Sequence, residues 1–209
     1  MKKAKFDTIL TKQELALLKK LNSPEKIQDW LEYIPFNTEE DGETLYSPRI
    51  VMQHKKAHCM EGALFATLAL AYHGHKPLLL DLKVDSIEHD FDHVVAVFKK
   101  DNHWGAISKT RHAVLRYRNP VYKNIRELVM SYFHEYFIKD GKKTLRSYST
   151  KPFNLLTLGY DWITSADDLF ELAEKLDKAP HTKILTPQME RGLRNASKIE
   201  IEAGEIVEN

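Results

Sequence analysis

The sequence predicts an α+β protein in which a central helix packs against an antiparallel sheet. The first observation is the run at 60–72, in which only two residues are clearly polar, so the helix it forms belongs inside a core. The second is the series of β-prone runs that follows, at 78–84, 93–98 and 103–108. The third is a set of capped, amphipathic patterns near both ends of the chain, which predicts extra N- and C-terminal helices.

Length and charge limit the organisation and the partners. A chain of 209 residues is expected to form one domain with a substantial core. Within 1–209 we distinguish a helical pair at 1–35, a core at 50–150 and a helical extension at 151–209. With 31 Lys and Arg against 30 Asp and Glu, the net charge of +1 provides no global field, so neither nucleic acid nor a membrane is expected as a partner.

The cysteine content and the apolar runs bear on the compartment. A single cysteine cannot form an internal disulfide and suits a reducing environment. The first twenty residues contain lysines but no apolar core of the signal-peptide kind. The run at 60–72 is too short to span a bilayer. We therefore expect a cytoplasmic protein.

Capping patterns predict the elements of the N-terminal part. Thr11 with Glu14 matches a capping box, and Ser23 followed by Pro24 opens a second helix. Gly74 is a typical stop for the central helix. The predicted elements are a loose segment at 1–6, helices at 11–21 and 23–34, a loop at 36–50 and the central helix at 59–73.

Alternating and β-branched residues predict the elements that follow. In the first strand Asp81 and Lys83 are expected to face outward, and 99–102 has the composition of a hairpin turn. Ser165 with Asp168 predicts a helix cap, and the acidic C-terminal end is expected to fray. The predicted elements are strands at 78–84, 93–98, 103–108 and 113–117, a helix at 124–137, an edge strand at 145–149, an apolar loop at 152–164, a helix at 166–178 and a short helix from Pro187.

Cys59 stands at the start of the central helix. The unpaired amides and the positive end of the helix dipole favour a thiolate there. Glu61, two residues later, is expected to oppose ionisation of the sulfur. A lone cysteine that heads an apolar helix can equally be a small buried hydrophobe, so this segment alone leaves both interpretations open.

Three stretches carry a resemblance to a known superfamily. Gln53 lies six residues before Cys59, and the helix that Cys59 begins runs through small residues to a glycine exit. The stretch 92–98 is DHVVAVF, and 104–110 is WGAISKT. Together these motifs are similar to the transglutaminase-like superfamily of papain-like thiol enzymes, over about residues 50–112.

The resemblance implies roles for individual side chains. Cys59 would be the nucleophile, and His93 the general base that takes its proton and later returns one to the leaving group. Gln53 would give its amide to the oxyanion hole, beside the backbone amide of the cysteine. The family places an aspartate or asparagine four residues after the tryptophan to orient the imidazole, and this chain has Ser108 at that position.

Ser108 is a departure from the family pattern. A hairpin that turns near 100–101 would put Ser108 directly opposite His93, where its oxygen can accept the imidazole N–H. The polar residues of the hairpin tip at 101–102 are excluded, because they would lie about 25–30 Å along the strands. Asp90, or a more distant carboxylate, is left open as a substitute.

A basic segment follows the predicted site. Residues 109–118 are KTRHAVLRYR, in which Arg116 and Arg118 alternate and would share one face of a strand. There they could make bidentate contacts with a carboxylate or phosphate, and together with Trp104 they are the predicted substrate-binding residues. A solvated strand face is the alternative interpretation.

We therefore predict a thiol-dependent hydrolase or acyltransferase that acts on an amide or ester carbonyl through a Cys59–His93 dyad and needs no cofactor. The lack of a calcium-loop pattern favours hydrolysis. The expected substrate is a peptide or small amide, and the basic segment would suit one that carries an anionic group. The main alternative is a non-catalytic binding module on the same scaffold, which Ser108 and Glu61 both favour. No oligomeric state is predicted.

A third interpretation, a metal-dependent hydrolase, is prompted by the ten histidines. His89 and His93 lie four residues apart, but in a loop and a strand rather than on one helix. The chain also offers only one thiol. No metal ligands are therefore predicted.

Overall fold

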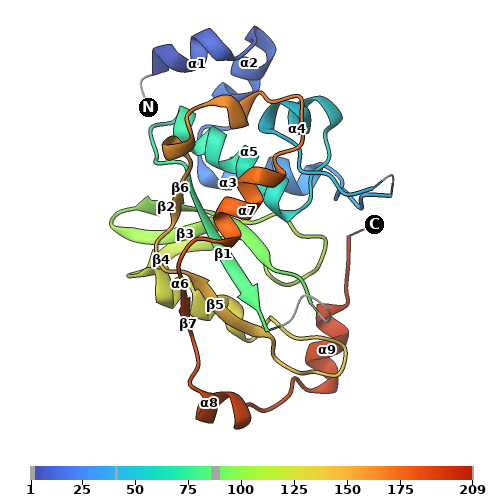
Figure 1. Ribbon diagram of the computed structural model, residues 1–209. Coiled ribbons are helices and arrows are strands. Elements are labelled where there is room, and N and C mark those ends of the chain that lie inside the picture. The colour runs from blue at the N-terminus through green and yellow to red at the C-terminus, as the bar shows by residue number, and fades with distance from the viewer. Residues whose placement is uncertain (1–2, 41, 86–89, 209) are drawn as a thin grey trace.

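The computed structural model describes residues 3–40, 42–85 and 90–208, and its architecture is α+β (Figure 1). The described strands form one antiparallel sheet of seven strands in the order β4-β3-β2-β1-β5-β7, with β6 also pairing with β1. The predicted fold class and antiparallel sheet are confirmed at this level. His89, which the metal interpretation used, lies outside the described residues.

The elements follow one another with short connections. The strands are β1 (Leu78–Val84), β2 (His93–Lys100), β3 (His103–Ile107), β4 (Arg118–Tyr122), β5 (Leu145–Ser149), β6 (Phe153–Asn154) and β7 (His181–Lys183). The helices are α1 (Lys3–Ile9), α2 (Lys12–Lys20), α3 (Pro24–Tyr33), α4 (Pro48–His54), α5 (Cys59–Tyr72), α6 (Ile125–Phe133), α7 (Phe170–Asp177), α8 (Pro187–Arg191) and α9 (Lys198–Gly204). Two 3-10 helices, η1 (Leu155–Leu158) and η2 (Asp161–Ile163), replace part of the predicted apolar loop.

The helices α1 to α4 gather around α5 on one side of the sheet (Figure 1). Thr11 and Glu14 form the predicted capping box at the start of α2, and Ser23 caps α3, so both helix starts are confirmed. Of the segment predicted to be loose at 1–6, the described residues 3–6 belong to α1, and Phe6 is fully buried and packs edge-on against Tyr72.

The loop predicted at 36–50 ends earlier than expected. Helix α4 begins at Pro48, with Ser47 as its N-cap and the proline in the first turn. The same Ser-Pro signal opens α3, but at 47–48 it lies inside a polar stretch whose composition predicts a loop. The helix α4 brings the residues just before Cys59 onto the surface of the N-terminal helical layer.

The sheet separates two apolar cores. Helix α5 is buried from Met60 to Tyr72, as its lack of a polar face predicts. One face of the sheet joins the core around α5, with Leu79, Ala96, Phe98 and Ile107 among its members. The other face joins a core with α6, with Leu80, Val95, Val97 and Tyr132 among its members. Each strand of the centre therefore buries both faces.

The β2–β3 hairpin sets the position of Ser108 relative to His93. The turn lies at 101–102, where Asp and Asn both have positive φ, as a two-residue hairpin turn of this kind requires. Ala96 therefore pairs with Ile107, and the predicted direct opposition of His93 and Ser108 is wrong by two residues of register. Because a shift of two keeps side chains on the same face, Ser108 still reaches His93 diagonally.

The sheet edges also differ from the prediction. No strand forms at 113–117, because Leu115 has a φ of +61°, which breaks the extended run, and β4 starts only at Arg118. The predicted edge strand β5 is internal, since β7 pairs with its outer side. Asp81 does not face outward but is buried, with His181 of β7 beside it.

The C-terminal part is more ordered than the sequence predicts. Helix α7 begins at Phe170 rather than near 166, because the carboxylate of Asp168 accepts a hydrogen bond from the distant Leu45 N–H at 2.6 Å instead of capping the helix. The acidic end does not fray. It forms α9, and then residues 206–208 run antiparallel to 111–113 with two backbone hydrogen bonds of 2.8 and 2.7 Å. None of the described helices has both the length and the apolar character that crossing a bilayer requires.

Candidate active site

The start of α5 is capped by its own neighbours. The N-cap residue is His58, whose Nδ1 accepts a hydrogen bond from the Met60 N–H at 3.2 Å. In return, the carboxylate of Glu61 accepts one from the His58 N–H at 2.9 Å. Glu61 is fully buried and also accepts hydrogen bonds from Asn37 Nδ2, Thr44 Oγ1 and the Tyr46 N–H. The main role of this carboxylate is thus to anchor the preceding loop on the helix start, which the sequence did not indicate.

Cys59 is the first residue of α5, and its half-buried side chain lies between two imidazoles. Both His58 and His93 are near enough to act on the ionisation of this thiol. Burial alone would raise the pKa of the thiol, but the hydrogen bonds and positive charges of His58 and His93 lower it to about 5. Burial likewise acts to lower the pKa of His58, whereas the hydrogen bond and charge of Cys59, with the charge of Glu61, raise it to about 9. The sulfur is therefore a thiolate at neutral pH.

The direction of a second hydrogen bond determines the tautomer of His93. Its Nε2 lies 2.7 Å from Ser108 Oγ, and that hydroxyl donates its proton to the Leu115 carbonyl at 2.5 Å. A hydroxyl has only one proton to donate, so Ser108 must accept from His93, and Nε2 carries a hydrogen. The remaining nitrogen, Nδ1, is the one that exchanges a proton with Cys59.

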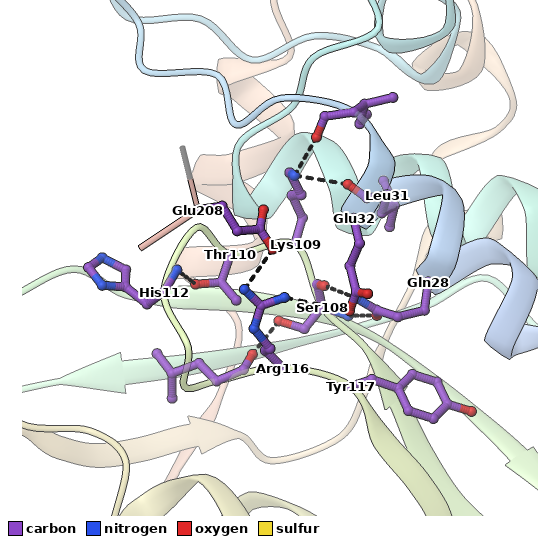
Figure 2. Close-up of polar contacts among 12 residues, drawn as sticks. Gln28, Leu31, Glu32, Ser108, Lys109, Thr110, His112, Arg116, Tyr117 and Glu208 are labelled. Carbon is purple, nitrogen blue, oxygen red and sulfur yellow. Dashed lines mark hydrogen bonds and ion pairs between the residues drawn. The ribbon is translucent and has the colours of Figure 1, made fainter. Parts of the chain in front are cut away.

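Ser108 is held in place by helix α3 (Figure 2). The buried amide of Gln28 pairs with the Ser108 backbone in both directions, accepting from its N–H at 2.9 Å and donating to its carbonyl at 2.8 Å. The next residue, Lys109, extends its amine to the C-terminal end of α3, where it donates to the carbonyls of Leu31 and Ile34 at 2.8 and 2.7 Å. These bonds tie the end of β3 to α3 over a long separation in sequence.

A glycine lets the end of β3 approach the cysteine helix. A Cβ added to Gly62 would lie 2.4 Å from the Cβ of Lys109, closer than two carbon atoms can pack. Gly62 is in the first turn of α5, three residues after Cys59. The close approach that this glycine permits is what brings Ser108 and His93 beside the thiol.

Two predicted site residues, Gln53 and Trp104, have no hydrogen bond to this cluster among the described residues. Gln53 is exposed in the last turn of α4, and within the described chain its amide has no hydrogen-bond partner. Trp104 is partly buried on β3, packed against the core of α6, with the Lys99 amine 4.8 Å from its ring centroid. The structure therefore brings together Cys59, His93 and Ser108, while the roles of Gln53 and Trp104 stay predictions.

The two predicted anion-binding arginines already have carboxylate partners in the chain. Arg116 contacts Glu208 at 2.6 Å and Glu32 at 3.6 Å (Figure 2). Arg118 contacts Glu135 at 2.6 Å. Neither arginine presents the open guanidinium that an anionic substrate group would need, so a substrate could use Arg116 only by displacing the C-terminal segment.

A second cluster of titratable groups joins β1, β7 and α7. The carboxylates of Asp81, Asp92 and Asp177 offer oxygens within 4.8 Å of one another. Lys83 binds Asp177, and His181 Nε2 lies 3.0 Å from an oxygen of Asp81. Burial and the charge of Asp92 raise the pKa of Asp81 to about 6. Because basic groups from two elements offset the three acids, we interpret this cluster as an ion-pair network that fastens β7 to β1.

Sequence reasoning missed several residues that support the site. Gln28 had a signal, since it lies at the centre of the buried stripe of α3, where a polar side chain needs partners. His58 had a weaker one, as a polar residue at an N-cap position with Glu three residues later. Leu115 and Glu135 had none, because nothing in their types or spacing indicates a contact with Ser108.

Searches of known protein families and of curated proteins find no match to this chain.

Proposed function

We propose that this chain is a thiol enzyme of the papain-like, transglutaminase-related kind, in which Cys59 attacks an amide or ester carbonyl with His93 as general base. The observation that supports this most strongly is the contact of one thiol with an imidazole whose other nitrogen is committed to Ser108 as a proton donor. In this arrangement the thiol proton moves to Nδ1 of His93, the position from which a leaving group can receive it.

The proposed reaction has two halves. The Cys59 thiolate adds to the carbonyl carbon, the electron pair moves to the carbonyl oxygen, and on collapse the leaving amine or alcohol takes the proton from His93 Nδ1. This leaves a thioester on the sulfur. An acceptor, water or an amine, then gives its proton to His93 and adds to the thioester, and the carboxylic acid or new amide departs as the thiol re-forms.

The developing oxyanion would need donors beside the sulfur. The backbone N–H of Cys59 is at the free end of α5, and no acceptor for it exists among the described residues. The side-chain amide of Gln53 also has no hydrogen-bond partner among the described residues, as expected for the second donor of an oxyanion hole. These two groups are our candidates for stabilising the tetrahedral intermediate.

A groove of about 680 Å³ supports a peptide or small amide as substrate. Its walls are mostly apolar, with Phe91, Leu115, Tyr136 and Ile201 among them. Leu115 links it to the site, because its carbonyl receives the Ser108 hydroxyl. Cys59 and His93 are not among the residues that line the groove, so a substrate held in it would have to extend past Leu115 to reach the thiol.

Alkylation of Cys59 by iodoacetamide as a function of pH tests this proposal directly. Since the chain has a single cysteine, the rate reports on this thiol alone. We expect rapid reaction at pH 6, with a midpoint near the lowered pKa of about 5. In urea the midpoint should return to about 8.5, the value of a free thiol. A native midpoint at that higher value would exclude an activated nucleophile.

The main alternative, a binding module without catalysis, has two observations in its favour. His93 has a neutral hydroxyl as partner, where the family has a carboxylate or amide, and Arg116 is already occupied by Glu208. Labelling with an electrophilic acyl probe distinguishes the two functions. A thiol enzyme forms a thioester on Cys59 that turns over, whereas a binding module leaves the probe unreacted.

A further inference from the structure

Leu115 has an unusual backbone conformation next to the candidate site. Its φ is +61°, in the left-handed region that a leucine avoids because its Cβ approaches the following carbonyl oxygen. The conformation directs the Leu115 carbonyl to the hydroxyl of Ser108, 2.5 Å away. Without this acceptor the hydroxyl proton could turn toward His93 and compete with its Nε2–H. The backbone of Leu115 thus determines that the Ser108 hydroxyl accepts a hydrogen bond from the imidazole rather than donating one.

A carboxylate from another element holds that conformation. The N–H of Leu115 donates to Glu135 Oε2 at 2.7 Å. Glu135 lies just after α6, and the same oxygen contacts Arg118 at 2.6 Å. Arg118 in turn donates hydrogen bonds to the hydroxyl and the carbonyl of Ser131. Its guanidinium carbon also lies 4.1 Å from the centroid of the Tyr132 ring. The carboxylate therefore cannot turn away from Leu115 without breaking an ion pair.

We infer that Glu135 is a positioning residue for the Cys59–His93 pair, acting through the backbone of Leu115 and the hydroxyl of Ser108. The inference rests on the proposed function. A hydrogen bond on each side of Leu115 holds it in the left-handed region, so the Ser108 hydroxyl stays an acceptor for His93. The carboxylate that usually contacts the imidazole directly acts here at a distance, through one residue of strained backbone.

A double-mutant cycle on Ser108 and Glu135 tests the path of this effect. The readout is the pH dependence of Cys59 alkylation. We expect Glu135→Ala to raise the pKa of the thiol by about 1 from its value of about 5, which lowers the rate by about twofold at pH 6 and by nearly tenfold at pH 4. Ser108→Ala should have a similar effect. The double variant should be no slower than Ser108→Ala alone, because Glu135 acts only through that hydroxyl. Additive losses would overturn the inference.

Two further variants separate positioning from general stability. Glu127→Ala removes a carboxylate at the other end of α6, where Glu127 accepts from the Lys123 N–H, and should leave the alkylation profile unchanged. Adding Leu115→Gly to Glu135→Ala should restore part of the lost rate, since glycine adopts positive φ without the Cβ conflict. If Glu135 merely stabilised Arg118, the glycine would restore nothing, and the inference would be wrong.

Nitrogen-15 NMR of the His93 side chain distinguishes failure of this inference from failure of the proposed function. At a pH high enough for the ring to be neutral, Nε2 should carry its single hydrogen in the wild-type protein, and in Glu135→Ala the two tautomers should mix. This result does not depend on an activated thiol. If Glu135→Ala left the tautomer unchanged, Glu135 would not be a positioning residue. The alkylation rate of Cys59 would still test the proposed thiol enzyme separately.

Discussion

Two histidines of this protein, the buried His93 and the partly buried His181, have opposite kinds of partner. His93 hydrogen bonds to the neutral hydroxyl of Ser108 at 2.7 Å, and its other nitrogen faces a thiol. His181 Nε2 lies 3.0 Å from the carboxylate of Asp81, and its Nδ1 lies 2.6 Å from the Ala179 carbonyl. A carboxylate–imidazole pair of the kind that the resembled superfamily has at its thiol is thus present in the chain, but at His181 rather than at His93.

The difference shows what each arrangement can do. His181 has an acceptor on both nitrogens, so its ring is fixed in place, joins two strands and has no nitrogen left for a reacting group. His93 has one nitrogen engaged and one that faces sulfur, which is the minimum for transferring a proton. Ser108 contributes no negative charge beside the His93 ring. The pKa of the thiol therefore depends on the two imidazoles beside it, His58 and His93, rather than on a carboxylate.

Replacing His93 should have the largest effect. His93→Gln keeps a hydrogen bond to Ser108 but cannot accept the thiol proton, so we expect alkylation of Cys59 at pH 6 to fall by about 100-fold, the typical size for loss of a positioned base. His181→Gln is the matched control and should leave the rate within a factor of two or so of wild type. Equal losses in both variants would mean that the comparison reflects folding rather than chemistry.

The second imidazole at the sulfur should have a smaller effect. His58 Nδ1 either accepts the Met60 N–H when the ring is neutral or donates to the thiolate when it is charged, but it cannot do both. With its pKa raised to about 9, the charged form prevails at neutral pH. His58→Asn keeps a good N-cap while removing this charge. We expect a loss of about fivefold in alkylation rate at pH 6 and rates that converge above pH 9.

That result would be contradicted if His58→Asn reacted as fast as the wild type over the whole pH range. It would then be His93 alone that lowers the pKa of the thiol. A matched measurement of thermal unfolding separates loss of the cap from loss of the charge, because asparagine should preserve the melting temperature within a few degrees.

Much of this fold could be predicted because its signals are local. The Thr11–Glu14 capping box, the apolar helix from Cys59 and the first three strands depend on residues within a few positions of one another, and they appear where the sequence indicates. The predicted helix cap at Ser165 and the predicted strand at 113–117 do not appear. The pairing of Cys59 with His93 could be expected only from a resemblance of motifs. The hairpin register failed by two residues, because the composition of 99–102 indicates a turn without specifying which two residues form it.

The support of the site could not be predicted, because it depends on side chains that meet across long separations in sequence. Gln28 and Ser108 are 80 residues apart, and Leu115 and Glu135 are 20 apart. A glutamine or glutamate has many possible partners, and its type does not name one. The docking of the acidic C-terminal end also depended on tertiary contacts, since Glu208 is held by a distant arginine.

The smallest effect on the thiol, and a distinct effect on stability, is expected at Asp81. Burial and Asp92 raise the pKa of Asp81 in the folded state to about 6, above its ordinary value of 3.8. Between these two values the unfolded chain loses the proton first, so the contribution of Asp81 to stability is complete below pH 4 and is lost as the pH rises through 6. Asp81→Asn cannot ionise and lacks this dependence.

We therefore expect the free energy of unfolding of the wild type to fall relative to that of Asp81→Asn by up to about 3 kcal/mol between pH 4 and pH 7. Urea denaturation at several pH values measures it. Alkylation of Cys59 should not change in this variant, because Asp81 fixes His181 rather than His93. Parallel stability curves would show that His181 and Lys83 compensate the charge of Asp81 fully. A slower thiol would instead show that the two histidines are coupled through the sheet, and their separation into a structural and a reactive pair would fail.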